Sequence, residues 1–155
     1  MARIQGISAN LSAFLDMLAF SEGTCRCGTN DGYDVIVGGT LFTDFSKHPD
    51  VLVHLSPTLA STAAGRYQLM ARYWKPYCTQ LGLSDFSPES QDAIAIQQIK
   101  ECHALAAIEA GQIAQAVSLC AHIWASLPGA GYGQHENQLQ ALLERFTAVG
   151  GTLAA

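Results

Sequence analysis

Apolar positions recur at helical spacing near the start of the chain. The first such pattern runs from Ser8 to Ser21, where apolar residues three and four apart share one face. Ser12 is a candidate N-cap, and Gly23 follows the pattern as a stop signal. These signals predict a helix that ends immediately before Glu22.

A short stretch of the sequence has strand character instead. Residues 24–32 are polar and predict a loop, and Tyr33–Val37 then reads as a strand. Gly38-Gly39 is typical of a tight turn, and Thr40–Phe45 reads as the returning strand. One hairpin among helices predicts an α+β fold with a mainly helical part and a small β part.

The middle of the chain predicts two more helices. The stretch from Ser56-Pro57 to Gly65 leads into a helix from Arg66 to about Leu81, in which Pro76 implies a kink or an early break. Ser87-Pro88 has the cap and first-turn proline of another helix start. Helical spacing favours core packing for most of the aromatic residues Tyr67, Tyr73, Trp74 and Tyr77.

The C-terminal part carries the clearest amphipathic stripe, from Ile113 to Leu127, and it stops at Pro128-Gly129. A glycine-rich loop follows. The last predicted helix is built on Leu139, Leu142, Leu143 and Phe146. Gly150-Gly151 ends it, and we expect the tail beyond to be frayed.

Composition narrows the possible classes of protein. The 155 residues suit a single domain, 1–155, and 49% hydrophobic content with 14% charged residues is typical of a compact fold. A net charge of −5 with scattered Lys and Arg argues against nucleic-acid binding. The apolar stretch Leu11–Phe20 is too short to span a membrane. Asp16 interrupts it and Ser-Glu follows it in place of a small-residue cleavage site, which argues against an export signal.

The five cysteines are odd in number and irregularly spaced, which favours reduced thiols over a disulfide framework. Cys25-Arg26-Cys27 is too tightly spaced for a usual zinc site and lacks a second ligand pair. We therefore expect neither a metal nor a cofactor.

Glu22 is the first candidate for chemistry. It follows Leu15 by seven residues and Leu18 by four, so a continuing helix would place its carboxylate on the apolar side. Burial and the negative end of the helix dipole both raise the pKa of a carboxyl group, as general-acid catalysis requires. The alternative is an exposed glutamate at a helix end, and position alone does not decide between the two.

Further stretches point to a family. Ser21-Glu22-Gly23-Thr24, Ala64–Leu69 and Leu127–Gln134 resemble the three motifs of lysozyme-like lytic transglycosylases. More closely, the chain is similar to the lambda-type phage endolysins over about Leu11 to Gly151. Besides the stretches around these motifs, GYDVIVGGTLFTDFS (32–46) and FSPESQDAIAIQQIKE (86–101) carry the likeness, in the same order.

The resemblance implies a lysozyme-like fold in which a glycan groove separates the helical lobe from the β-hairpin lobe. It implies that Glu22 is the acid/base catalyst, and that Gln68, Tyr132 and Tyr67 line the groove. Asp34, on the hairpin, would belong to the opposite wall. The implied reaction cleaves the MurNAc-GlcNAc bond of peptidoglycan with one carboxylate and leaves 1,6-anhydro ends.

Two other readings stay open. Asp31 lies nine residues after Glu22, the separation used by inverting phage muramidases, but Val37 stands where those enzymes carry a threonine. Asp31 also suits a turn beside Gly32. A hydrolytic muramidase, or a glycan-binding module without catalysis, is therefore an alternative. The loop with Cys25-Arg26-Cys27 departs from the family pattern.

The resemblance also suggests where the protein acts. We expect a monomer that accumulates in the host cytoplasm and reaches the periplasmic peptidoglycan when a holin, a separate membrane protein, opens the inner membrane.

Overall fold

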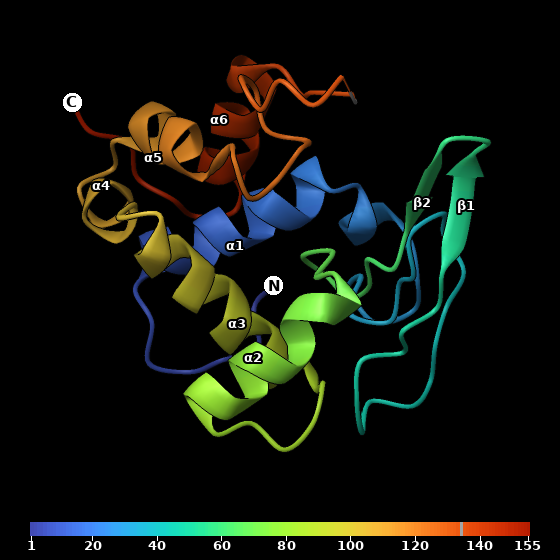
Figure 1. Cartoon of the computed structure of the whole chain (residues 1–155). Coiled ribbons are helices and arrows are strands. Elements are labelled where there is room, and N and C mark those ends of the chain that lie inside the picture. Colours follow the sequence, from blue (N-terminus) through green and yellow to red (C-terminus); the bar gives the residue numbers. More distant parts are fainter. Residues whose placement is uncertain (134) are drawn as a thin grey trace.

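The computed structural model describes residues 1–133 and 135–155. Within them the chain forms six α-helices, one 3-10 helix and a two-stranded antiparallel sheet (Figure 1), which confirms the predicted α+β class. In chain order the elements are α1 (Ala9–Ser21), η1 (Thr24–Arg26), β1 (Val53–Ser56), β2 (Leu59–Ser61), α2 (Ala71–Leu81), α3 (Pro88–Glu101), α4 (Leu105–Glu109), α5 (Ile113–Cys120) and α6 (Leu139–Ala148).

Helix α1 lies in the middle of the helical part, with α4 and α6 packed against it (Figure 1). Nine of its 13 residues are buried, so it is enclosed on most sides rather than on one face. The helix begins one residue after the predicted start. Its cap is Ser8, whose hydroxyl accepts the Leu11 N–H at 3.0 Å, so the prediction of Ser12 as the cap was wrong.

The predicted hairpin over 33–45 forms a turn but no paired strands. Val35 and Leu41 make only an isolated bridge. The reason is competition: the Val37 N–H donates to Ala63 O at 2.9 Å, and the Gly65 N–H donates to Val35 O at 2.8 Å. The 33–37 segment is thus held by residues 63–65. The hairpin of the fold is instead β1 and β2, for which the sequence predicted no strands.

The predicted helix from Arg66 starts five residues late, at α2. Residues 64–69 form a tight turn, closed by two hydrogen bonds of 3.0 Å between Ala64 and Leu69. Gly65 has a φ of +80°, and a Cβ there would meet the Gln91 side chain at 2.3 Å, so the turn requires glycine. The helix continues through Pro76 to Leu81, so the predicted early break does not occur.

The aromatic residues predicted on this helix differ in burial, because Tyr67 lies in the turn and the others lie on α2. Tyr67 is buried in the turn itself, whereas no residue of α2 is buried. Trp74 packs edge-on against Phe86, with 5.1 Å between ring centroids, and Tyr73 is exposed. Core packing was therefore correctly predicted for Tyr67 and only partly for the others.

The C-terminal part agrees better with the sequence. Helix α3 starts at Pro88 with Ser87 as its cap, as predicted. The amphipathic stripe was predicted from Ile113 to Leu127. Helix α5 accounts for its first part and ends at Cys120, and the remaining residues lie in turns. The tail was expected to fray, and it is instead held by hydrogen bonds: Ala154 N–H to Gly111 O, and Thr152 N–H to the side chain of Asn10.

Candidate active site

A cavity of about 490 Å³ opens where the end of α1 faces the 35–39 segment. Its other walls come from Gln68, from Ala125 and Ser126, and from His135. The residues that line it are thus far apart in sequence. The predicted groove between a helical and a β part corresponds to this cavity, although its β wall is the 35–39 turn rather than a regular hairpin.

Glu22 lines this cavity and is the C-cap residue of α1. Its backbone remains helical and its N–H donates to Leu18 O at 2.8 Å, so the side chain keeps the direction predicted from Leu15 and Leu18. The residue is half-buried. Removal of water from around the carboxylate raises the pKa of Glu22 to about 7, and a hydrogen bond from Ser126 opposes part of that rise.

No second carboxylate lines the cavity among the described residues. Asp31 lies elsewhere, paired with Arg3 at 3.1 Å and with the N-terminal amine at 3.5 Å. Asp34 is buried, and its Oδ2 accepts hydrogen bonds from the N–H and the hydroxyl of Thr29. The hairpin segment therefore contributes a wall, through Val35 and its neighbours, but Asp34 does not line it as expected.

Gln68 does line the cavity, as expected. Its backbone has a φ of 52°, and its Nε2 donates to Gly65 O at 2.9 Å and to Val35 O at 3.3 Å. Both carbonyls are acceptors, so they fix the amide with its nitrogen toward the protein. The Oε1 atom remains, and Gln68 therefore offers a bound molecule an acceptor.

The turn that carries Gln68 is held against the helix that carries Glu22. Thr24 Oγ1 donates to Arg66 O at 2.6 Å and to Ala19 O at 3.2 Å. The buried Arg66 guanidinium pairs with Asp16, a buried carboxylate inside α1. These contacts fix the relative positions of Gln68 and Glu22.

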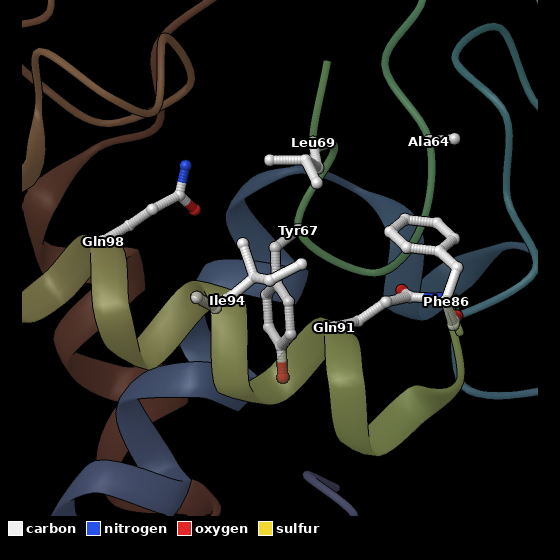
Figure 2. A pocket seen from close by; sticks show the side chains of 8 residues that line it. Ala64, Tyr67, Leu69, Phe86, Gln91, Ile94 and Gln98 are labelled. Carbon is white, nitrogen blue, oxygen red and sulfur yellow. The ribbon is translucent and has the colours of Figure 1, made fainter. Parts of the chain in front are cut away.

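Two residues expected in the groove lie outside it. Figure 2 shows Tyr67 directed from the 64–69 turn onto α3, and its hydroxyl donates to Asp92 Oδ1 at 2.7 Å. Burial raises its pKa well above the usual value, so it stays neutral. Tyr132 is 57% exposed, is absent from the described lining, and donates its hydroxyl to His122 O at 3.0 Å. Gln134, from the same motif, lies outside the described residues.

The sequence did not indicate three further residues of the site, of which Ser126 contacts Glu22 directly. Ser126 Oγ donates to Glu22 Oε1 at 2.6 Å, and Asn137 binds both Ser126 and Ser21. His135 is exposed and also lines the cavity. Ser126 lies within the stretch Ile123–Gln134, which carries the family resemblance, whereas His135 and Asn137 lie outside every such stretch.

The described residues contain no cluster of three or more His, Cys, Asp or Glu side chains arranged to hold a metal ion. Cys25 and Cys27 are free thiols, and Cys27 lines the cavity. Among the helices described, none is long and apolar enough to cross a bilayer.

Comparison with known proteins places this geometry in a family. The endolysin family profile matches residues 12–153. The chain is 59% identical to the endolysin of Escherichia phage lambda, over 95% of both chains, and 50% identical to that of Escherichia phage P2, over 94% of this chain and 95% of the relative.

Solved structures agree with the sequence relatives. Bacteriophage lambda lysozyme complexed with a chitohexasaccharide superposes with a TM-score of 0.93 at 59% identity, covering 97% of this chain and 99% of that one. A second structure of lysozyme from bacteriophage lambda gives 0.90 at 56% identity, with the same coverage. The fold is lysozyme-like, and the chain belongs to the endolysin family.

Proposed function

We propose that this endolysin is a lytic transglycosylase that cleaves the MurNAc-GlcNAc bond of peptidoglycan and leaves 1,6-anhydro-MurNAc ends. Membership of the family, with its lysozyme-like fold, makes it a peptidoglycan-degrading enzyme. The finer assignment concerns how the bond is broken, and the cavity supports one answer over the other.

The observation that carries the proposal is a single carboxyl group in the described lining of the cavity. Hydrolytic glycosidases of the usual kind need a second carboxylate, as nucleophile or as base for water. The nearest candidates in sequence, Asp31 and Asp34, are engaged by Arg3 and Thr29. Val37 lines the cavity where the inverting muramidases carry a threonine, so no side-chain hydroxyl is present there to hold a water molecule.

One carboxyl group is sufficient if the substrate supplies the rest. Glu22 protonates the glycosidic oxygen as the bond to C1 of MurNAc breaks, and the N-acetyl carbonyl of MurNAc stabilises the cationic carbon. The C6 hydroxyl of the same sugar then attacks C1 and returns its proton to Glu22. The enzyme is regenerated and no water is consumed. A pKa of about 7 leaves enough protonated Glu22 at neutral pH to start this cycle.

Gln68 is proposed as a positioning residue for the substrate. Since its Nε2 is occupied by two backbone carbonyls, Oε1 is suited to accept a hydrogen bond from an N-acetyl N–H or a sugar hydroxyl. That contact would orient the sugar for attack by its own hydroxyl. We further propose, on the family resemblance, that the enzyme is a monomer and that a holin gives it access to the cell wall.

Product analysis tests the proposal directly. Purified sacculi digested in ¹⁸O-labelled water are expected to release muropeptides with anhydro ends, lighter by one water and free of the label. A hydrolase would instead leave reducing ends that carry ¹⁸O. Mass spectrometry of the released fragments distinguishes the two, and labelled reducing ends as the main product would overturn the transglycosylase assignment.

Activity is expected to fall as pH rises through about 7, because deprotonated Glu22 has no proton to donate. A carboxyl group near its ordinary pKa of 4.5 would lose activity far lower on the scale. The measurement is the initial rate of sacculus solubilisation from about pH 5 to about pH 9 at constant ionic strength. A descending limb centred near pH 4.5 would contradict the role given to burial.

A further inference from the structure

A chain of hydrogen bonds links Glu22, through two serines that also line the cavity, to Asn137, which is not among the described lining. Ser126 Oγ lies 2.6 Å from Glu22 Oε1, and Ser21 Oγ lies 2.8 Å from Ser126 Oγ. Asn137 Nδ2 in turn lies 3.1 Å from Ser21 Oγ. The chain therefore runs from Asn137 through two hydroxyl groups to one oxygen of the catalytic carboxyl group.

The direction of these bonds follows from Asn137. Its Nδ2 also contacts the backbone carbonyls of Ser21, at 3.0 Å, and of Ser126, at 3.2 Å. Carbonyls only accept, so the amide group must present its nitrogen here and donate. The two hydrogens of Nδ2 are shared among three acceptors, and Ser21 Oγ can only accept from this nitrogen, so its own hydrogen is available to Ser126. The hydrogen of Ser126 is left for Glu22.

The opposite direction of donation along these hydrogen bonds is unfavourable. If Glu22 donated a proton to Ser126, then Ser126 would donate to Ser21, and the Ser21 hydrogen would face an NH₂ group that cannot accept it. An unpaired donor in this part-buried site carries a desolvation penalty. Glu22 Oε1 is thus held as an acceptor in both protonation states. Oε2 has no hydrogen-bond partner among the residues that the structure describes.

We propose that Ser126, Ser21 and Asn137 are positioning residues that hold Glu22 by Oε1 and so assign the transferred proton to Oε2. This inference rests on the proposed role of Glu22 as acid and base. The bond from Ser126 strengthens when Glu22 loses its proton, because hydrogen bonds to a charged oxygen are stronger than those to a neutral one. The chain of hydrogen bonds therefore stabilises the carboxylate that forms as the glycosidic bond breaks.

Other titratable groups line the cavity, and the test must distinguish the titration of Glu22 from theirs. His135 and Cys27 line it with Glu22, and no other charged side chain is among its described lining. The ¹³C resonance of the Glu22 carboxyl carbon, identified by its loss in Glu22→Gln, reports on Glu22 alone. Titrating the substrate-free protein in a His135→Gln background removes the imidazole contribution.

The main variant is Ser126→Ala. Loss of a hydrogen bond that favours the charged form is expected to raise the Glu22 pKa by about one unit. The descending limb of the pH–rate profile should move up by the same amount, and the rate on the acidic plateau should fall about tenfold. Ser126→Thr keeps the hydroxyl and should restore both. Ser118→Ala, an exposed serine on α5, is the matched control and should change neither.

A second variant covers the case in which Ser126→Ala does not fold. Ser21→Ala leaves Ser126 in place but removes the hydrogen bond that Ser21 donates to it. The bond from Ser126 to Glu22 is then weaker, because hydrogen bonds in a chain strengthen one another, so a smaller pKa rise in the same direction is expected. An unchanged Glu22 pKa in a folded Ser126→Ala protein, or in Ser21→Ala if that is the one that folds, would overturn the proposal. The titration needs no substrate, so hydrolytic products would refute the transglycosylase assignment without affecting this result.

Discussion

Replacing Glu22 with glutamine is expected to slow the lysis of purified sacculi by about 10³-fold, the size of effect typical of a lost general acid and base. The amide has the shape of the carboxyl group and still offers Oε1 to the hydroxyl of Ser126. It has no proton to donate to the glycosidic oxygen and cannot accept one from the C6 hydroxyl. Turbidity loss of sacculi, followed at about pH 6 where most Glu22 is protonated, measures the effect.

Loss of activity in this variant is not expected to come from unfolding. The folded state raises the Glu22 pKa from 4.5 to about 7, so the folded protein binds this proton more tightly than the unfolded chain does. Folding stability therefore falls as pH rises from about 4.5 to about 7. Glutamine does not titrate, so its folding stability does not fall over this pH range. The variant should therefore be at least as stable as the parent at neutral pH.

Binding supplies the control for the same variant. Glu22→Gln protein should still sediment with sacculi, since the cavity walls are unchanged. Retained binding without lysis supports catalysis by Glu22. Unchanged lysis would remove Glu22 from the mechanism, and a parent protein that binds sacculi without releasing fragments would favour the non-catalytic glycan-binding alternative.

Replacing Asp92 with alanine is expected to destabilise the protein by about 4 kcal/mol or more, because it leaves buried donors without acceptors. Asp92 is fully buried on α3. Its Oδ1 accepts the hydroxyls of Tyr33 and Tyr67, both at 2.7 Å. Its Oδ2 accepts the backbone N–H groups of Arg3 and Ile4, at 2.6 and 2.9 Å. One carboxylate thus holds the N-terminal segment and the turn beside the cavity.

Asparagine should not rescue this site. All four partners of Asp92 donate, so an amide nitrogen placed toward either pair would face another donor. Urea denaturation of Asp92→Ala and Asp92→Asn measures both changes in the free energy of unfolding. Asp44→Asn, at an exposed carboxylate, is the matched control and should lie within the error of the measurement. Stability close to the parent in Asp92→Asn would show that Asp92 is not required as an acceptor of four bonds.

The structure explains why some sequence predictions succeeded. The α1 helix and the cap of α3 depend on periodicity and on bonds within three or four residues, which the sequence displays directly. The elements that were predicted at the wrong positions depend on which distant segments form hydrogen bonds with each other. Residues 33–37 have strand character, but their backbone groups pair with residues 63–65, and the 64–69 turn takes Tyr67 out of the predicted helix.

Glu22, the proposed catalytic residue, illustrates the same limit. Its spacing from Leu15 and Leu18 predicted a carboxylate on the apolar side of a helix end, and the ordered motifs pointed to its chemistry. Whether it is buried enough to hold a proton at neutral pH depends on walls contributed by other parts of the chain. The structure supplies those walls and raises the pKa of Glu22 to about 7.

The sequence by itself determined the main helices, the α+β class, the position of Glu22 and the family resemblance, because each rests on local periodicity or on short motifs. Only the tertiary structure decided which atoms meet at the cavity. Ser126 is 104 residues from Glu22 and Asn137 is 116 residues from Ser21, and hydrogen bonds over such separations leave no periodic signal. The same holds for the removal of Tyr67 and Asp34 from the groove, since each is turned inward by partners that only folding brings near.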